Sequence, residues 1–298
     1  MATRNRTRSR RGTAREGGTY VAPVLDPNWH SPYEPSAGER HANAVALRRY
    51  AVRRKTPAAV VVGIAVVVLF ALFSVSWWFP ILGVALGALY TWDLRRSVVR
   101  IERQGQRLGP LLRESLREAG THADRARLDT LIERLGPTFG LSDVKGVVAE
   151  DPVYNAALVP DPSGWSLFVT LGALHELDLV ELEGMIAHVM ARHRLGQLGR
   201  QSAAAVAVNL SAEARRELSG PGSAYRADEV AAAAIRYPLG LAGALRRCAT
   251  QSVPADSFFA GEVYAATCGV WFNRASGRGP DVSELDDVTL RAASLEEW

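Results

Sequence analysis

Cysteine and lysine are both scarce in this chain of 298 residues. The two cysteines, Cys248 and Cys268, form no Cys-x-x-Cys motif, so neither a disulfide-rich scaffold nor a zinc knuckle is indicated. The two lysines are Lys55 and Lys145, and arginine supplies the remaining positive charge. Together with the abundance of alanine, this composition is typical of a GC-rich bacterial genome.

The sequence also lacks the motifs of several common enzyme classes. It has no Gly-x-Ser-x-Gly elbow of a serine hydrolase and no Gly-x-x-x-x-Gly-Lys phosphate loop. Its first 40 residues contain no apolar core, and no apolar run closely follows Arg10-Arg11. We therefore expect neither of those two chemistries, no secretory signal and no twin-arginine signal.

Charge is distributed unevenly along the chain. Residues 1–56 contain twelve Lys or Arg and four acidic residues, a net charge of +8, while the whole chain carries +4 and the remainder therefore −4. The first part of this segment has few aliphatic side chains and cannot bury enough surface to fold alone. We expect residues 1–45 to form a disordered basic tail. Because a membrane segment is predicted next, its arginines should touch anionic lipid, and no nucleic-acid partner is expected.

An apolar run without charge covers residues 58–92, which is 35 residues. One membrane-spanning helix needs only about 20 residues, so two short helices with a turn near residues 74–80 fit better than one. Basic residues flank both ends of the run, which favours both ends on the cytoplasmic side. We predict a transmembrane hairpin over residues 57–93, with a single tilted span as the alternative.

The chain after about residue 97 has the pattern of one mixed domain. Two short β-rich runs occupy residues 144–149 and 166–170, and a turn signal precedes the second. Asp178 followed by Glu181 is a capping-box pattern that should begin a helix with a buried apolar stripe. Further helices are predicted over residues 101–119, 128–135, 226–234 and 239–247.

Four segments carry a further signal: DPVYNA at residues 151–156, LFVTLGAL at 167–174, LDLVELEGMIAH at 177–188 and the pair Ala227-Asp228. These segments and the order of the elements resemble the HtpX-like, CAAX-prenyl-protease-like family of membrane zinc metallopeptidases over about residues 95–297. The resemblance implies an α+β, zincin-like domain over residues 97–298, mostly helical with a small sheet and preceded by the transmembrane hairpin.

The catalytic positions of that family are not kept. The helix motif His-Glu-x-x-His binds zinc through two histidines and activates water through the glutamate, but this chain has His188, Val189 and Arg192 at those places. The resemblance puts the third ligand, a glutamate, at Ala224. Val189 cannot accept a proton, and the permanent cation of Arg192 would repel a metal ion. We predict no catalytic residue, no metal and no cofactor, His188 being the one retained ligand position.

Nearby residues could rebuild a metal site only with difficulty. His193 lies about 140° around the helix from His188, His175-Glu176 lacks a partner histidine, and Glu181 fits a capping role. A salt bridge between Arg192 and Asp228 could instead join two helices. The resemblance places Asn155 and Asp228 at a cleft, where a peptide could add to an edge strand over residues 167–170.

The function predicted from these observations is a membrane-anchored, catalytically inactive homologue that acts as a binding or regulatory scaffold. Its partners would be the membrane and peptide segments, or a membrane protein, in the vestigial cleft. The location would be the inner (plasma) membrane, with the domain facing the cytoplasm. One alternative is an active membrane-bound zinc metalloendopeptidase with displaced ligands and zinc as cofactor. A third is a structural membrane subunit that does not use the cleft.

Overall fold

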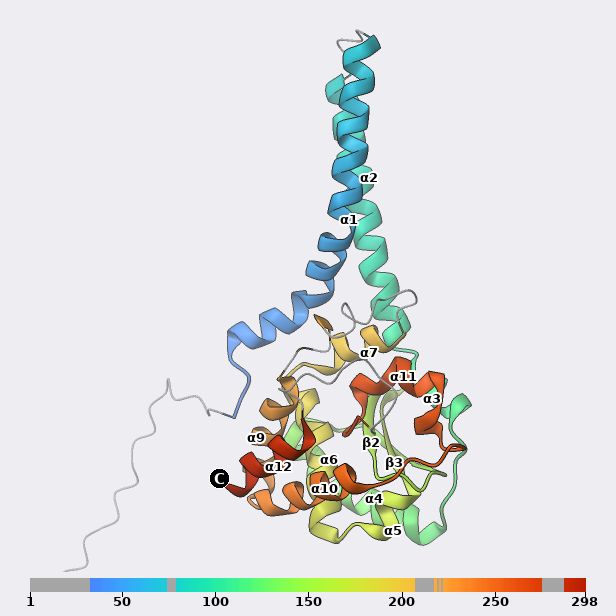
Figure 1. Cartoon of the computed structure of the whole chain (residues 1–298), viewed down its shortest axis with the longest axis vertical. Coiled ribbons are helices and arrows are strands. Elements are labelled where there is room, and N and C mark those ends of the chain that lie inside the picture. Colours follow the sequence, from blue (N-terminus) through green and yellow to red (C-terminus); the bar gives the residue numbers. More distant parts are fainter. Residues whose placement is uncertain (1–32, 74–78, 207–216, 219, 221, 275–286) are drawn as a thin grey trace, which may run out of the picture. The chain divides into compact units, whose positions relative to one another are not determined.

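The computed structural model describes residues 33–73, 79–206, 217–218, 220, 222–274 and 287–298. These residues form a mostly helical structure with one small sheet (Figure 1). The predicted tail, residues 1–45, lies mainly outside the described residues. Its last part belongs to α1, which begins at Ala37.

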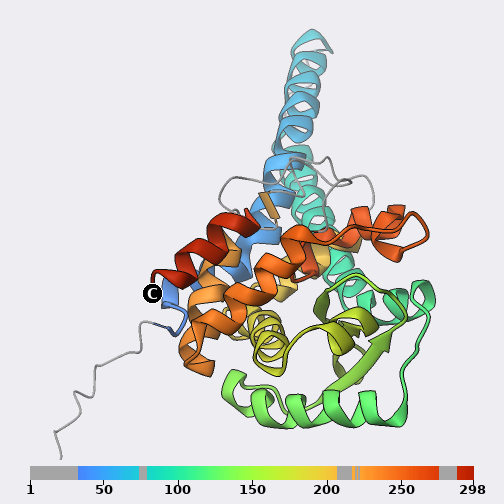
Figure 2. The same ribbon diagram turned by 60° about the horizontal axis from the view of Figure 1, so that its bottom comes forward.

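Two long helices, α1 (Ala37–Phe73) and α2 (Phe79–Gly105), lie side by side (Figures 1 and 2). Polar contacts join them: Lys55 pairs with Asp93, and the hydroxyl groups of Thr56 and Tyr90 are 3.0 Å apart. The run of residues 58–92 is divided between them, with sixteen uncharged residues (58–73) ending α1 and fourteen (79–92) opening α2.

The prediction of a transmembrane hairpin is wrong for this structure. Among the described residues, no helix combines the length and the apolar character that crossing a membrane requires. The physical reason is the division of the run, because each apolar segment is shorter than the roughly 20 residues of a span. The rest of α1 is polar and strongly basic.

The sheet has three strands in the order β1-β3-β2. Strand β1 (Val144–Ala149) is parallel to β3 (Gly164–Thr170), and β2 (Ala156–Asp161) forms an antiparallel hairpin with β3. Strand β3 is therefore central, with both of its edges paired. This corrects the prediction of an edge strand over residues 167–170, and strand addition at β3 is excluded.

The two faces of the sheet belong to two separate cores. Leu167 and Val169 of β3 face a core that includes α4 (His122–Leu135) and α6 (Leu179–Arg194). Phe168 faces the opposite core, with α3 (Leu108–Ser115) and the large rings of residues 258–271. This alternation follows from the two-residue period of a strand. The predicted strands and helices near residues 128–135, 144–149 and 166–170 are confirmed.

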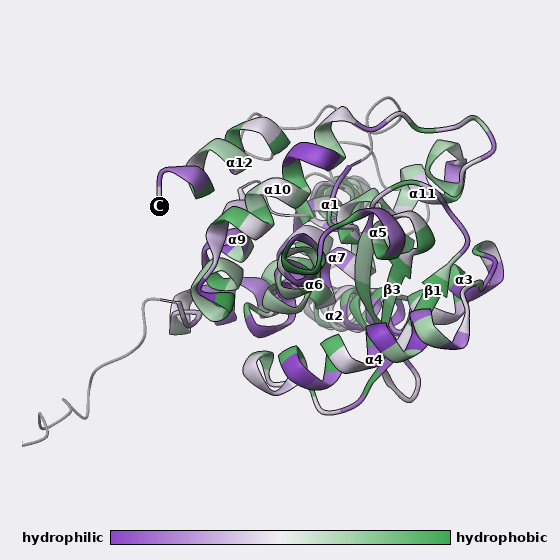
Figure 3. Cartoon of the chain, turned by 90° about the horizontal axis from the view of Figure 1, so that it is seen from below, coloured by the Kyte–Doolittle hydropathy of each residue, from purple (hydrophilic) through white to green (hydrophobic). Residues whose placement is uncertain are grey.

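Helix α6 lies between the sheet and a group of helices consisting of α9 (Ser223–Ile235), α10 (Pro238–Thr250) and α12 (Val288–Glu296) (Figure 3). The predicted capping box of Asp178 and Glu181 is confirmed at its start. Gly184 lets the helix approach α10 closely, because a Cβ there would lie 2.7 Å from the Cα of Leu241. Close packing on several sides buries the residues from Gly184 to Arg192.

The remaining described elements are short helices and turns. They are α5 (Leu171–Glu176), α7 (Leu198–Val206) and α11 (Glu262–Thr267), with short 3-10 turns at Gly136–Phe139, Phe258–Ala260 and Cys268–Val270. The helix predicted over residues 101–119 is interrupted, since α2 ends at Gly105 and α3 begins at Leu108.

Candidate functional site

Four charged or titratable side chains meet inside the helical half of the domain. His188 and Arg192 lie four residues apart on α6 and therefore share one helix face. Asp228 comes from α9 and Arg291 from α12. Their exposed fractions are 0%, 5%, 3% and 2% in that order, so all four are removed from solvent. Buried charges are rare unless they are paired, which makes this group the candidate site.

Asp228 is the centre of the group. Its Oδ1 lies 2.6 Å from Nδ1 of His188. Arg291 donates to both carboxylate oxygens, from Nε to Oδ2 at 2.6 Å and from Nη2 to Oδ1 at 2.8 Å. Such two-point contacts between a guanidinium and a carboxylate are strong and fix the relative orientation of the two groups. They connect α9 to α12, while the histidine connects α9 to α6.

Arg192 contacts the second ring nitrogen of His188. Its Nε donates to Nε2 of His188 at 3.1 Å, and its Nη1 donates to the carbonyl oxygens of Gly269 at 3.2 Å and Trp271 at 3.1 Å. Since Nε2 accepts a hydrogen bond, Nδ1 must carry the ring proton of the neutral imidazole and donate it to Asp228. Both ring nitrogens are therefore occupied by contacts within the protein.

The charges of the group follow from burial and from these neighbours. Burial, helped by the positive charges of Arg192 and Arg291, lowers the pKa of His188 from 6.5 to about 3 despite the opposing effect of Asp228. Burial alone would raise the pKa of Asp228, but the charge of Arg291 and the contacts with His188 lower it to about 2. At neutral pH the histidine is neutral and the aspartate is ionised.

An aromatic ring covers the same group. The rings of Phe272 and His188 meet edge to face, with centroids 5.1 Å apart, and the guanidinium carbon of Arg291 lies 5.7 Å from the centre of the phenyl ring. Phe272 is itself 1% exposed. A histidine with both nitrogens occupied, no exposed atom and a pKa near 3 is unsuited to general base catalysis at neutral pH.

The residues at the predicted metal-ligand positions do not fit a zinc ion. A small cavity of about 40 Å³ is lined by Arg192, Ala224 and Arg291, so two of the three positions do face one space. However, a methyl group and a guanidinium offer no lone pair to a metal. In the described part of the chain, no group of three His, Cys, Asp or Glu residues could hold a metal ion.

The remaining predicted site residues lie elsewhere or have other contacts. Val189 is fully buried in the hydrophobic core. Asn155 is also fully buried, and its side-chain amide donates to the carbonyl oxygen of Asn273 and accepts from the amide N–H of that residue. Asn155 thus fastens the start of β2 to residue 273 and is not exposed to a cleft.

The alternative ligands have ordinary structural roles. His193 packs its ring against Trp165, with centroids 4.6 Å apart, and His175 pairs with Asp124 at 2.9 Å. Glu181 accepts a hydrogen bond from the backbone N–H of Asp178 at 3.0 Å, as its capping role requires.

Sequence reasoning assigned the wrong partner to Asp228. The predicted ion pair with Arg192 is not among those formed by the described residues, in which Asp228 pairs with His188 and Arg291. Arg291 gave a signal that could have been recognised. It lies on the apolar stripe of α12 together with Val288, Ala292 and Leu295, and a charged residue on such a stripe indicates a buried ion pair.

Comparisons of the chain with protein-family models, with curated proteins and with solved structures give no match. The similarity to HtpX-like peptidases thus stays a prediction from the motifs in the sequence.

Proposed function

We propose that this chain is a non-catalytic relative of HtpX-like zinc metallopeptidases and acts as a binding or regulatory scaffold. The observation that carries the proposal is the contact of Arg192 Nε with His188 Nε2. A guanidinium donates there, where the retained histidine of a zinc peptidase would offer its lone pair to the metal.

The contact of His188 with Asp228 supports the same origin. A histidine that binds a metal usually donates its other ring N–H to a carboxylate, which fixes the tautomer and the ring orientation. His188 donates Nδ1–H to Asp228 in this way. The arrangement therefore has the outer contact of a metal site, with an arginine in place of the ion.

A surface groove of about 1000 Å³ gives the proposed scaffold a place for a partner. It lies where β3 passes into α5 and where residues 254–258 run alongside. The exposed carboxylates of Glu176 and Asp256 line it, and Glu150 there is paired with Arg117 at 3.2 Å. A peptide segment with basic side chains would be complementary to the two carboxylates of Glu176 and Asp256. The groove includes none of the predicted metal positions.

Metal analysis of variants tests the loss of catalysis. In the double variant Arg192→His, Ala224→Glu, the cation is replaced by a second histidine and the cavity gains a carboxylate. We expect about one zinc per chain in this variant and none in the wild type, because catalytic zinc sites have three protein ligands. The matched control Arg192→Met removes the cation without adding a ligand and should bind no zinc.

Activity is tested with the triple variant that also carries Val189→Glu. Casein cleavage by the triple variant alone would support a lapsed peptidase. About one zinc per chain in the wild type, with casein cleavage, would instead establish an active peptidase and overturn the proposal. A double variant that is folded by circular dichroism but binds no zinc would contradict the descent of these positions from a metal site.

A further inference from the structure

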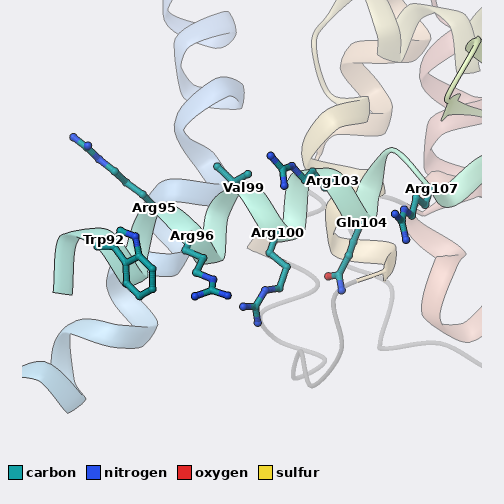
Figure 4. A pocket seen from close by; sticks show the side chains of 8 residues that line it. All are labelled: Trp92, Arg95, Arg96, Val99, Arg100, Arg103, Gln104 and Arg107. Carbon is teal, nitrogen blue, oxygen red and sulfur yellow. The ribbon is translucent and has the colours of Figure 1, made fainter. Parts of the chain in front are cut away.

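A second unusual feature lies on α2, away from the buried site. Five arginines line a shallow groove of about 570 Å³ together with Trp92, Val99 and Gln104; we call this the arginine groove, and its arginines are Arg95, Arg96, Arg100, Arg103 and Arg107. All five are exposed. Trp92, Arg96, Arg100 and Gln104 extend to one side of the helix, and Arg95, Val99 and Arg103 to the other (Figure 4). This follows from their spacing of four residues.

Acids among the described residues leave the positive charge of the groove unneutralised. In the part of the chain that the structure describes, none of the five guanidinium groups forms an ion pair. Residues 93–107 contain two acids, Asp93 and Glu102, and Asp93 is paired with Lys55. The guanidinium of Arg96 lies 5.0 Å from the centre of the Trp92 ring, which holds one cation beside an aromatic face.

Exposed apolar side chains continue from the groove along both long helices. On α2, Val84, Leu89 and Trp92 are 74%, 57% and 55% exposed, and on α1 Val61 and Ile64 are 66% and 58% exposed. Single exposed apolar residues are ordinary, but a series of them on adjacent helices indicates an interaction surface. A nucleic acid has no apolar layer that would cover these exposed side chains. A lipid surface combines anionic phosphates with an adjoining apolar layer, which matches both parts.

We infer that the arginine groove binds the phosphate groups of an anionic phospholipid surface, with Trp92 at the boundary between headgroups and acyl chains. Arginine suits this role because its planar fork donates two parallel hydrogen bonds to a phosphate. Tryptophan is enriched at the same boundary, since its ring is apolar and its N–H is polar. The inference is independent of the proposed function, because no residue of the buried site takes part.

Vesicle flotation of the full chain tests the inference. The vesicles consist either of phosphatidylcholine alone or of phosphatidylcholine with about 30% phosphatidylglycerol, at about 0.1 M salt. The triple variant Arg96→Gln, Arg100→Gln, Arg103→Gln should bind the anionic vesicles about a hundredfold more weakly than the wild type, at roughly one fivefold step per arginine. Binding of the wild type should also fall when salt is raised to about 0.5 M.

Two matched variants separate the groove from general charge. Arg117→Gln, Arg125→Gln, Arg134→Gln removes the same charge from exposed positions outside the groove, and its binding should change less than about threefold. Replacing the three groove arginines by lysine keeps the charge but removes the two-point hydrogen bonds, so binding should lie between that of the wild type and that of the glutamine variant. Circular dichroism checks that each variant is helical, which is expected because glutamine and lysine are good helix formers.

Each remaining outcome overturns the inference. Equal binding of the wild type to neutral and anionic vesicles would show that the arginines do not recognise headgroups. An equal loss of vesicle binding in the control variant Arg117→Gln, Arg125→Gln, Arg134→Gln would show that binding depends only on the net charge of the protein. Groove-dependent binding of a labelled single-stranded oligonucleotide, without vesicle binding, would identify a nucleic-acid surface. Displacement from vesicles by soluble glycerol phosphate at about millimolar concentration would indicate a free phosphate ligand instead.

Discussion

Acidification should destabilise this protein through one buried histidine. The pKa of His188 is about 3 in the folded chain, against an ordinary value of 6.5. Between these two values the unfolded chain binds a proton that the folded chain excludes, so the free energy of unfolding must fall as the pH falls. From about pH 7 to about pH 5 the loss from His188 alone is about 2 kcal/mol, at a slope of up to about 1.4 kcal/mol per pH unit.

Urea unfolding at a series of pH values measures this slope. In His188→Gln the side chain does not titrate, yet its amide can still accept from Arg192 and donate to Asp228. This variant should be less stable at neutral pH, but its stability should vary less between about pH 7 and about pH 5. His193→Gln is the matched control: the pKa of His193 is also lowered by burial, but that ring is half-buried and should contribute less. If His188→Gln retained the full pH dependence of the wild type, the assignment of a buried neutral imidazole would be refuted.

Three further outcomes follow from the same packing. Asp228→Asn should lower the free energy of unfolding by about 3–5 kcal/mol in urea titrations, because it removes the buried carboxylate charge that pairs with Arg291. Gly184→Ala should cost about 1–3 kcal/mol in the same assay, since the new methyl group would lie 2.7 Å from the Cα of Leu241. Cys248, whose pKa burial raises to about 12, should react with a thiol reagent at neutral pH only after unfolding.

Local signals in the sequence predicted much of the helical domain. The capping box of Asp178 and Glu181, the apolar stripe of α6 and the β-rich run of β1 each depend on residues close together in the chain. Such signals survive because the local preference and the final packing agree. The second strand was not recognised, since the segment Ala156–Asp161 ends in Pro-Asp and begins with two alanines, which are weak strand formers.

Long-range relations were harder to predict. The position of β3 in the middle of the sheet depends on its pairing with β1 and β2, and no local pattern distinguishes it from an edge strand.

The wrong prediction of a transmembrane hairpin over the apolar run has a different cause. Composition alone treated residues 58–92 as one segment, but the helices end at Phe73 and resume at Phe79, so the length relevant to a span is that of each piece.

The sequence predicted the shared helix face of His188 and Arg192 but not the ion pair of Asp228 with Arg291. His188 and Arg192 were placed on one face because a spacing of four residues requires it. The contact of His188 with Asp228 depends on how α9 crosses α6. The ion pair of Asp228 with Arg291 depends on the position of α12, because Arg291 lies 63 residues further along the chain. The sequence analysis gave Asp228 one cationic partner, Arg192, whereas the structure pairs Asp228 with Arg291.

Under the proposed function, these buried contacts take the place of a lost metal ion. In the peptidase family that the sequence resembles, an ion would join the helices from within. Here Arg192 contacts His188 and two carbonyl oxygens of residues 269 and 271, while Arg291 fastens Asp228 to α12. Replacing such buried charges with apolar residues is often neutral or stabilising, so stability alone does not explain them. Their directed hydrogen bonds fix the relative positions of α6, α9 and α12, which is what the scaffold proposed above requires.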